Sequence, residues 1–415
     1  MAKNHGILVV DVGTTKICAM VGEFKEDGLW ITGMGVSPSY GLKKGVVIDI
    51  EEATTSIREA VDKALTQSKA DLDKLITYTS IAGTHIKTTS GMGTKVLKEQ
   101  EVTYEDVRDA IEIAQAGSKS EDRRILHALP KEFVIDHQKG IINPVGMTGK
   151  RLEVHVNLIT CNASTLQNLL RCFQKLGLEV NGVVFQGLAS AEAVLTPEEK
   201  DLGVIVIDFG GGTTDVVAYW NGVLRLAFSL PVGGELLTND LAIGLRTSKQ
   251  IAEEIKKEKG VCLRELVNGD EIIEVPGIGN RPVRKVNRQF IAEILELRVK
   301  ELFELVAREL KKYMLEETGK LDIRSKFGSG IVLTGGSSQL PGLILTVDQM
   351  FDLPTRIGLP SNLNGIGDEI LAPQFSTAVG MFYYAKTELE SEEFDFPEGG
   401  LLEKLKRAFG KFFKK

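Results

Sequence analysis

The chain has 415 residues, of which 43% are hydrophobic and 26% are charged, and only four are cysteines. This composition excludes a disordered, a collagen-like or a disulfide-scaffold protein, and the length predicts two or more domains. The net charge of −7 argues against nucleic acid as a partner, because a phosphate backbone attracts basic surfaces.

From the N-terminus onward, apolar runs typical of buried strands alternate with stretches of helical periodicity. The predicted strands are Ile7–Val10, Leu75–Ile81, Val154–Thr160, Val204–Ile207 and Ile331–Leu333. The predicted helices are Glu51–Thr66, Tyr104–Gln115 with Thr103 as its cap, Ser164–Leu176, Arg288–Glu316, one that starts near Pro341, and Thr377–Lys386. Glycine turns after the strands predict an α/β fold with ligand sites at the strand ends.

An internal repeat predicts how these elements are arranged. The segment 6–13 (GILVVDVG) matches the segment 203–210 (GVIVIDFG) position by position, 197 residues later. Each copy continues into a Thr-Thr pair and then into a second apolar stretch, Ile17–Val21 or Val216–Trp220. We therefore predict two related α/β halves that face each other.

The two repeat loops predict a phosphate-binding site. Glycines let backbone N–H groups approach a polyphosphate, threonine hydroxyls add donors, and a lysine adds charge. The aspartates would repel phosphate, but each can hold waters of a bound Mg²⁺, so Asp11 and Asp208 are the predicted metal residues, acting through water. Asp215 fits either a metal-water contact or a turn. The predicted nucleotide-binding residues of the loops are Asp11, Gly13, Thr14, Thr15, Lys16, Asp208, Gly210, Gly211, Gly212, Thr213 and Thr214.

Two further segments fit the same site. The turn formed by Gly335, Gly336 and Ser337 follows a predicted strand, and its small residues would let a ribose or a base approach closely. Glu253 and Lys256 are three residues apart on one predicted helix face, from which both would reach the ribose or the base. A solvated, charged helix face is the alternative for this pair.

These four motifs together resemble the actin/heat-shock-chaperone/sugar-kinase ATPase superfamily. Within it, the chain resembles the FtsA family of bacterial cell-division proteins over essentially its whole length, on the segments 140–154, 208–215, 231–234 and 373–378. The resemblance implies an actin-like ATPase fold, with two related halves around a nucleotide cleft and an FtsA-type α/β subdomain inserted in the first half. It also implies ATP and Mg²⁺ as cofactors.

The family pattern divides the chain into subdomains. The expected ranges are 1–83 (subdomain 1A, continued by 162–200 and about 366–386), 84–161 (inserted subdomain 1C), 202–245 (2A, continued by 320–365) and 246–319 (2B). Residues 387–399 hold six acids and no base, which predicts an acidic, flexible linker.

Residues 400–415 predict a cationic amphipathic helix that lies on an anionic membrane surface. A helix docked on the protein's own body is the alternative. The N-terminus lacks a signal-peptide pattern and no apolar run would span a bilayer, so we expect a peripheral protein on the cytoplasmic side of the inner membrane. The predicted membrane residues are Leu401, Leu402, Leu405, Phe409, Phe412, Phe413, Lys404, Arg407 and Lys411.

The resemblance further implies a filament-forming protein that tethers the tail of FtsZ to the membrane at the division septum and helps to recruit later divisome proteins. It places the FtsZ site near 246–319. There Arg288, Arg298 and Lys300 are the candidate partners of an acidic peptide, with plain solvation of the helix as the alternative.

For catalysis the resemblance offers one candidate, Gln186, which would position the water that attacks the γ-phosphate. A buried structural glutamine is an equal alternative. Since no other residue resembles a general base, we expect ATP binding with at most weak ATPase activity. The alternative function is a small-molecule kinase or another phosphotransferase of the same fold. Such an enzyme needs a catalytic acid in an acceptor pocket and has no use for an amphipathic tail.

Overall fold

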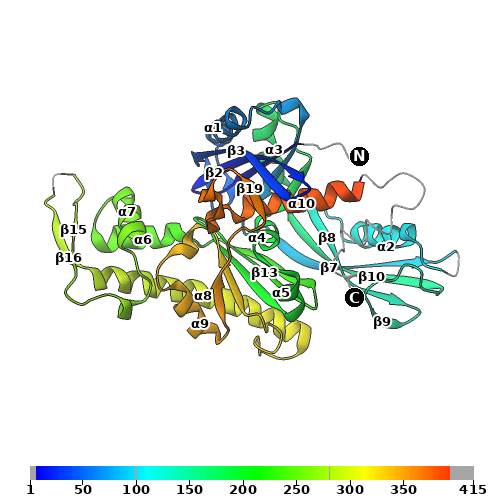
Figure 1. The fold of residues 1–415 in the computed structure, drawn as a ribbon. Coiled ribbons are helices and arrows are strands. Elements are labelled where there is room, and N and C mark those ends of the chain that lie inside the picture. Colours follow the sequence, from blue (N-terminus) through cyan, green and yellow to red (C-terminus); the bar gives the residue numbers. More distant parts are fainter. Residues whose placement is uncertain (1–5, 99–100, 280, 393–415) are drawn as a thin grey trace.

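The computed structural model describes residues 6–98, 101–279 and 281–392. Three main sheets give it an elongated shape (Figure 1). The first half lies at the top of Figure 1 and the second half below it, while a small sheet and a helical part project to opposite sides. The predicted membrane helix and residues 393–399 of the predicted linker lie outside the described residues.

The first sheet has the first repeat strand near its centre, because β1 pairs in parallel with β6 and antiparallel with β2. β19, whose residues we assigned to the second half, instead pairs with β3 and extends this sheet. Across the sheet the strands are β11 (Gly182–Phe185), β6 (Leu75–Ile81), β1 (Gly6–Val12), β2 (Lys16–Lys25), β3 (Gly28–Pro38) and β19 (Leu363–Gly365). A separate two-stranded ladder joins β4 (Leu42–Lys43) and β5 (Val46–Val47).

Two helices cover the outer face of this sheet. α1 (Ile50–Ser68) packs on β2 and β3, and α3 (Ala163–Lys175) packs on α1. Asp49 caps α1, because its side chain accepts hydrogen bonds from the N–H groups of Glu51 and Glu52. A Cβ on Gly35 of β3 would lie 2.0 Å from the carbonyl oxygen of Ala60, so only glycine lets α1 lie this close. Both predicted helices are confirmed to within two residues.

Two other helices lie between the halves. α4 (Gln186–Val194) packs on the second-half sheet and on α10 (Ser376–Glu392), and α10 packs on the first sheet. The predicted helix Thr377–Lys386 is confirmed, but α10 continues through the first six residues of the predicted linker. The expectation that the linker starts at residue 387 is therefore wrong, because Leu389 still packs against the core and keeps this turn helical.

The second sheet repeats the pairing of the first. β12 pairs antiparallel with β13 and parallel with β17, as β1 does with β2 and β6, which confirms the two related halves. Across this sheet the strands are β14 (Val223–Leu230), β13 (Thr214–Trp220), β12 (Val204–Phe209), β17 (Ile331–Thr334) and β18 (Thr355–Ile357).

Helices cover the outer face of the second sheet, where alternate strand residues enter a second core. The longest is α8, whose 31 residues span about 46 Å. It starts where the sequence predicts and ends two residues later, at a glycine cap with a φ of 69°. The elements of this part are α5 (Pro197–Leu202), α6 (Gly234–Leu245), α7 (Lys249–Lys259), α8 (Arg288–Thr318), α9 (Leu343–Phe351) and the hairpin of β15 (Ile272–Val275) and β16 (Arg284–Asn287).

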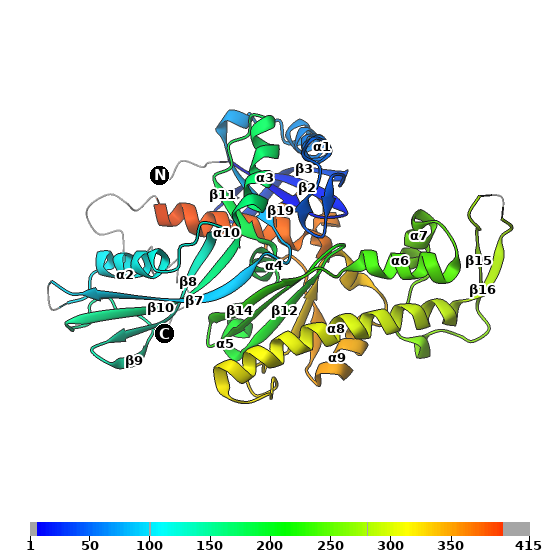
Figure 2. The same ribbon diagram turned by 180° about the vertical axis from the view of Figure 1, so that it is seen from behind.

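The third sheet forms the inserted part, which has its own small core. Its helix begins one residue after Thr103, whose side chain forms the predicted cap. Thr88 exchanges two hydrogen bonds with the backbone of Ala227 on β14, so the insert also touches the second half (Figure 2). The elements are β7 (Lys87–Val96), β10 (Arg151–Asn162), β8 (Arg123–Ile135), β9 (Gln138–Ile141) and α2 (Tyr104–Ala116).

Candidate nucleotide-binding site

The first predicted loop is a tight hairpin between β1 and β2. The N–H of Gly13 donates to the carbonyl of Lys16 over 3.1 Å, which closes the turn. Asp11 is buried, and its Oδ1 accepts hydrogen bonds from Ser80 Oγ (2.8 Å) and Gln186 Nε2 (3.1 Å). Burial raises the pKa of Asp11, so a cation beside it would stabilise the charged carboxylate.

The second loop repeats this geometry at the end of β12. The N–H of Gly210 donates to the carbonyl of Thr213 over 3.0 Å. Asp208 is buried and accepts hydrogen bonds from Ser190 Oγ (2.5 Å) and Thr377 Oγ1 (3.2 Å). Burial raises the pKa of Asp208 to about 6. Each loop therefore has one buried carboxyl behind a glycine turn.

The two loops touch each other. A Cβ added to Gly211 would lie 2.4 Å from Thr15 Cγ2, and one added to Gly212 would lie 2.5 Å from Thr14 Oγ1. A side chain at either glycine would push the loops apart. The structure thus brings the two halves of the repeat into direct contact, so that one ligand could reach both loops.

Lys16 follows the first loop and points to the segment before α10. Its Nζ donates to the carbonyl of Gln374 over 2.6 Å and lies 3.9 Å from the centre of the Phe375 ring. Burial lowers the pKa of Lys16, while the negative charges of Asp11 and Asp208 oppose this shift. The lysine is therefore close to both carboxyls.

The third glycine turn contacts the second loop. Gly335 has a φ of 83°, and a Cβ there would lie 2.2 Å from Asp208 Oδ1. Ser337 Oγ donates to the carbonyl of Gly210 over 2.9 Å. A short 3₁₀ turn starts at Gly336, and the helix predicted near Pro341 begins two residues later, as α9 at Leu343. A ribose or base at this place would therefore contact the turn and not the end of a long helix.

Glu253 and Lys256 face α6, so the alternative of a fully solvated pair is wrong. Lys256 Nζ lies 2.6 Å from Glu253 Oε2 and donates to the carbonyl of Gly234 (3.1 Å) and to Thr238 Oγ1 (2.9 Å). A Cβ on Gly234 would lie 2.3 Å from Ser337 Oγ and 3.4 Å from Lys256 Nζ. The pair therefore adjoins the third glycine turn.

Gln186 is buried beside the first loop. Besides Asp11, its Nε2 contacts the carbonyl of Val12 (3.2 Å) and Ser80 Oγ (3.0 Å). These contacts fit a structural role in holding the Asp11 carboxyl. The water-positioning role stays a prediction.

Sequence reasoning missed the hydroxyl groups that hold the two carboxyls. Ser80, Ser190 and Thr377 come from β6, α4 and α10, and no motif marks them, because only the tertiary fold brings them to the aspartates. A weak signal exists for Thr377, which lies in one of the segments that resemble the FtsA family.

Asp215 on β13, left open above, is also part of the site. Its Oδ1 is buried and has no hydrogen-bond partner in the described part of the chain. Burial raises the pKa of Asp215 to about 8, and the nearby charge of Asp208 adds to the shift. Within residues 6–98, 101–279 and 281–392, no three acidic, histidine or cysteine side chains converge as direct metal ligands. The three aspartates therefore fit a Mg²⁺ held through its waters.

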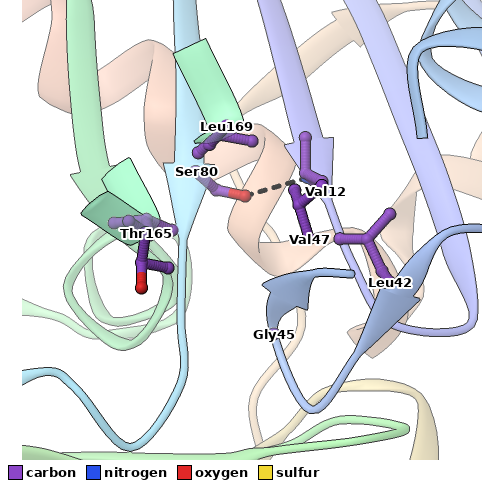
Figure 3. Close-up of a pocket in the computed structure, with 8 residues that line it drawn as sticks. Val12, Leu42, Gly45, Val47, Ser80, Thr165 and Leu169 are labelled. Atoms are coloured by element: carbon purple, nitrogen blue, oxygen red, sulfur yellow. Dashed lines mark hydrogen bonds between the residues drawn. The ribbon is translucent and has the colours of Figure 1, made fainter. Parts of the chain in front are cut away.

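A small cavity lies behind the first loop (Figure 3). In Figure 3 the Ser80 hydroxyl points to Val12, whose N–H donates to it over 3.0 Å. The cavity measures about 10 Å³, which is room for about one water molecule and far too little for a nucleotide. The nucleotide prediction therefore rests on the three turns and not on this cavity.

Comparison with known proteins identifies the family. Residues 205–380 match the family model of cell division protein FtsA, and residues 83–160 match that of the SHS2 domain inserted in FtsA. FtsA of Pseudomonas aeruginosa is 39% identical over 412 residues, which cover 97% of this chain and 96% of the relative. FtsA of Neisseria meningitidis serogroup B is 40% identical over 412 residues, or 97% of each chain. The chain belongs to the FtsA family of cell division proteins.

Solved structures confirm the actin-like ATPase fold expected for an FtsA protein. The PilM–PilN type IV pilus biogenesis complex matches with a TM-score of 0.63 at 15% identity, covering 90% of this chain and 96% of that one. MreB5 of Spiroplasma citri bound to AMPPNP gives 0.55 at 14% identity (94% and 98%). The MamK double helical filament gives 0.53 at 13% identity (92% and 99%). At these identities the likeness concerns the fold alone.

The bases proposed for FtsZ binding are already paired within this FtsA chain. Arg288 binds Glu271, and Arg298 binds Asp240 through two nitrogens and Glu301 through the third. The side chains of Arg288 and Arg298 are only 22% and 28% exposed. The expectation that these two arginines stay accessible is therefore wrong.

Lys300 is more open, with a side chain that is 45% exposed, but it too pairs, with Glu296 at 2.6 Å. The role of the three bases in FtsZ binding stays a prediction.

In the part of the FtsA chain that the structure describes, no helix is both long and apolar enough to cross a membrane.

Proposed function

We propose that this FtsA-family protein binds ATP with Mg²⁺, assembles into actin-like filaments, and tethers the FtsZ tail to the inner face of the cytoplasmic membrane. It would act peripherally, through residues 400–415, at the division septum, where it helps to recruit later divisome proteins. We propose at most weak ATPase activity, because Gln186 is the sole candidate for positioning a water and its amide nitrogen already holds Asp11.

The contact between the two glycine loops is the observation that carries the nucleotide proposal. Phosphates bound at the edge of this contact would meet backbone N–H groups and the hydroxyls of Thr14 and Thr213. Mg²⁺ would neutralise charge on the phosphates and on the carboxylates of Asp11 and Asp208. The third turn and the Glu253–Lys256 pair lie on the second-half side of the loops, where the ribose and base would follow.

One sedimentation experiment tests the proposed membrane attachment. Full-length protein and a variant lacking 400–415 are pelleted with and without Mg²⁺-ATP, and with and without anionic vesicles. We expect only the full-length protein to pellet with vesicles, less so at high salt, since exposed charges are screened. Equal pelleting of both proteins would contradict the membrane role.

A separate assay tests the alternative function. ATP-dependent transfer of phosphate to small alcohols would support the kinase alternative.

Assembly has support in the fold. The MamK relative forms a double helical filament with the same fold. A head-to-tail contact between subunits produces a filament when the rotation between subunits does not close into a ring, and we propose such a contact here. Electron microscopy of the protein on lipid monolayers with Mg²⁺-ATP should show filaments, and dispersed particles alone would contradict this part.

The apolar surface beside the Arg298–Asp240 pair is a better candidate for binding the FtsZ tail than the three paired bases. Ile243 on α6 is 76% exposed, and Phe290 and Leu297 on α8 are 43% and 65% exposed. Positions 290 and 297 share one face of α8, which packs on α6. A short peptide needs such an apolar surface with a few fixed polar groups at its rim.

Matched variants on one helix test this surface. Leu297→Glu should weaken binding of a peptide from the conserved end of FtsZ about tenfold in a fluorescence titration, because it places a charge in the apolar patch. Leu315→Glu is the control, since Leu315 lies on the same helix, is 51% exposed and is far from the patch. Equal peptide affinity of both variants would move the site elsewhere.

A further inference from the structure

A groove lies at the edge of the first half that faces away from the nucleotide loops. β11 runs parallel to β6, and β6 to β1, so their starting ends lie opposite to the loop that follows β1. The groove precedes the start of β11 and measures about 400 Å³, within the range of ligand and peptide pockets. It is lined by Leu170, Gln174, Gly177, Leu178, Glu179 and Val180.

The chain leaves the described structure next to this groove. A Cβ on Gly182, two residues after the groove, would lie 3.2 Å from Glu388 Oε2 on α10. Val180 of the groove and Leu389 pack on the same core. α10 ends at Glu392, one turn later, and the sequence then continues for 23 residues. The eight residues from 393 to 400 can extend over about 26 Å, so residues 401–413 can reach the groove.

The chemistry of the groove suits this segment. Its walls offer the partly buried side chains of Leu170 and Val180 beside the buried Leu178, and Glu179 is exposed at its rim. The neighbouring Lys175 forms an ion pair with Glu51, which offsets its positive charge. Residues 401–413 bring seven apolar side chains, and residues 400–415 hold six bases and one acid. The segment can thus fill the groove with an apolar side chain and pair its charge with Glu179.

We propose that the apolar side chains of residues 401–413 dock in this groove when the protein is off the membrane. Groove and lipid then compete for the same side chains. The proposal rests on the membrane role proposed above, which it deepens into a form of regulation. Docking within one chain acts at high effective concentration, and the apparent vesicle affinity equals the intrinsic affinity multiplied by the fraction of undocked tails. A single molecule would then bind membrane weakly, while a filament presents many tails together.

Cross-linking in the full-length protein tests the docking. The four native cysteines are buried, so two added cysteines, Gln174→Cys and Leu405→Cys, are the reactive pair under mild oxidation. We expect an intramolecular cross-link in solution that falls several-fold when anionic vesicles are added. The control pairs Leu405→Cys with Asp348→Cys, an exposed position on α9 in the second half. Equal cross-linking at both positions would overturn the proposal, and cross-linked dimers would assign the groove to the tail of a second copy instead.

A groove variant gives an independent measurement. Gln174→Arg places a positive charge among the groove residues and should release the tail, so that vesicle affinity rises several-fold, while Asp348→Arg should leave it unchanged. ATP binding and thermal unfolding should match the parent protein in both. If full-length protein binds vesicles but Gln174→Arg binds no tighter, the docking inference fails and the membrane function stands. If deletion of 400–415 leaves vesicle binding intact, the membrane function itself fails.

Discussion

The glycines of the second loop show at the scale of single residues how the site depends on close approach. Gly211→Val should abolish ATP binding, a loss of at least a hundredfold or about 3 kcal/mol, because its side chain would meet Thr15 and separate the loops. A fluorescence titration with Mg²⁺-ATP measures this. Gly117→Ala is the control, since a Cβ there has 3.6 Å of room. Wild-type affinity in Gly211→Val would move the phosphates away from this loop.

A buried histidine predicts how stability depends on pH. The N–H of Phe185 donates to His127 Nε2 (3.0 Å), so in the neutral ring Nδ1 carries the proton and donates to the Tyr384 hydroxyl (2.9 Å). Burial lowers the pKa of His127 to about 3, from an ordinary value of 6.5. Between these values the unfolded chain binds more protons, so the free energy of unfolding falls as the pH drops below 6.5.

This histidine should therefore cost the wild-type protein about 2 kcal/mol of stability between pH 7 and pH 5. The loss should be smaller in His127→Gln, because glutamine does not titrate, and thermal unfolding at several pH values measures the difference. His155→Gln, at a less buried histidine on β10, is the control and should keep the pH dependence of the parent. An unchanged pH dependence in His127→Gln would contradict the assignment.

At the scale of helices, the half-buried ion pair between Asp240 on α6 and Arg298 on α8 stabilises the contact between the two helices. Arg298→Glu should lower the free energy of unfolding by roughly 2 kcal/mol, since it leaves Asp240 and Glu301 facing a third acid. Lys300→Glu is the matched control. The Lys300 side chain, which pairs with Glu296, is more exposed, and exposed ion pairs contribute little to stability. Chemical unfolding measures both. Equal stability of the two variants would mean that the α6–α8 contact does not depend on Arg298.

At the scale of the whole molecule, the inserted subdomain is a continuous segment that has its own core but also contacts both halves. Lys87 pairs with Thr160 where the chain enters and leaves, so a short linker can replace residues 88–159. This variant loses the contacts of His127 with Phe185 and Tyr384, so we expect it to be less stable than the parent. We still expect it to bind Mg²⁺-ATP, because none of the three glycine turns lies in the replaced segment. We expect it to lose filaments on lipid monolayers, since the insert would flank the contact between subunits. Normal filaments by electron microscopy would contradict that role.

The sequence by itself determined the parts that local chemistry encodes. Buried strands need long apolar runs, so the repeat strands β1 and β12 and their two glycine loops were readable directly, as were the cap at Thr103 and the length of α8. The superfamily resemblance followed from the glycine turns and their aspartates, and the FtsA resemblance followed from the segments 140–154, 208–215, 231–234 and 373–378.

Only the tertiary structure decided which groups surround those motifs. Ser80, Ser190 and Thr377 hold the aspartates from three different elements. Nothing in the local sequence indicates this for Ser80 or Ser190, and for Thr377 only the family segment 373–378 gives a weak signal. The same holds for Arg298, which looks solvated in the sequence but binds Asp240, 58 residues away. A charged side chain is free or paired according to what packs beside it, and long-range packing is not written in the local pattern. That is why the loops were predicted correctly and the free arginines were not.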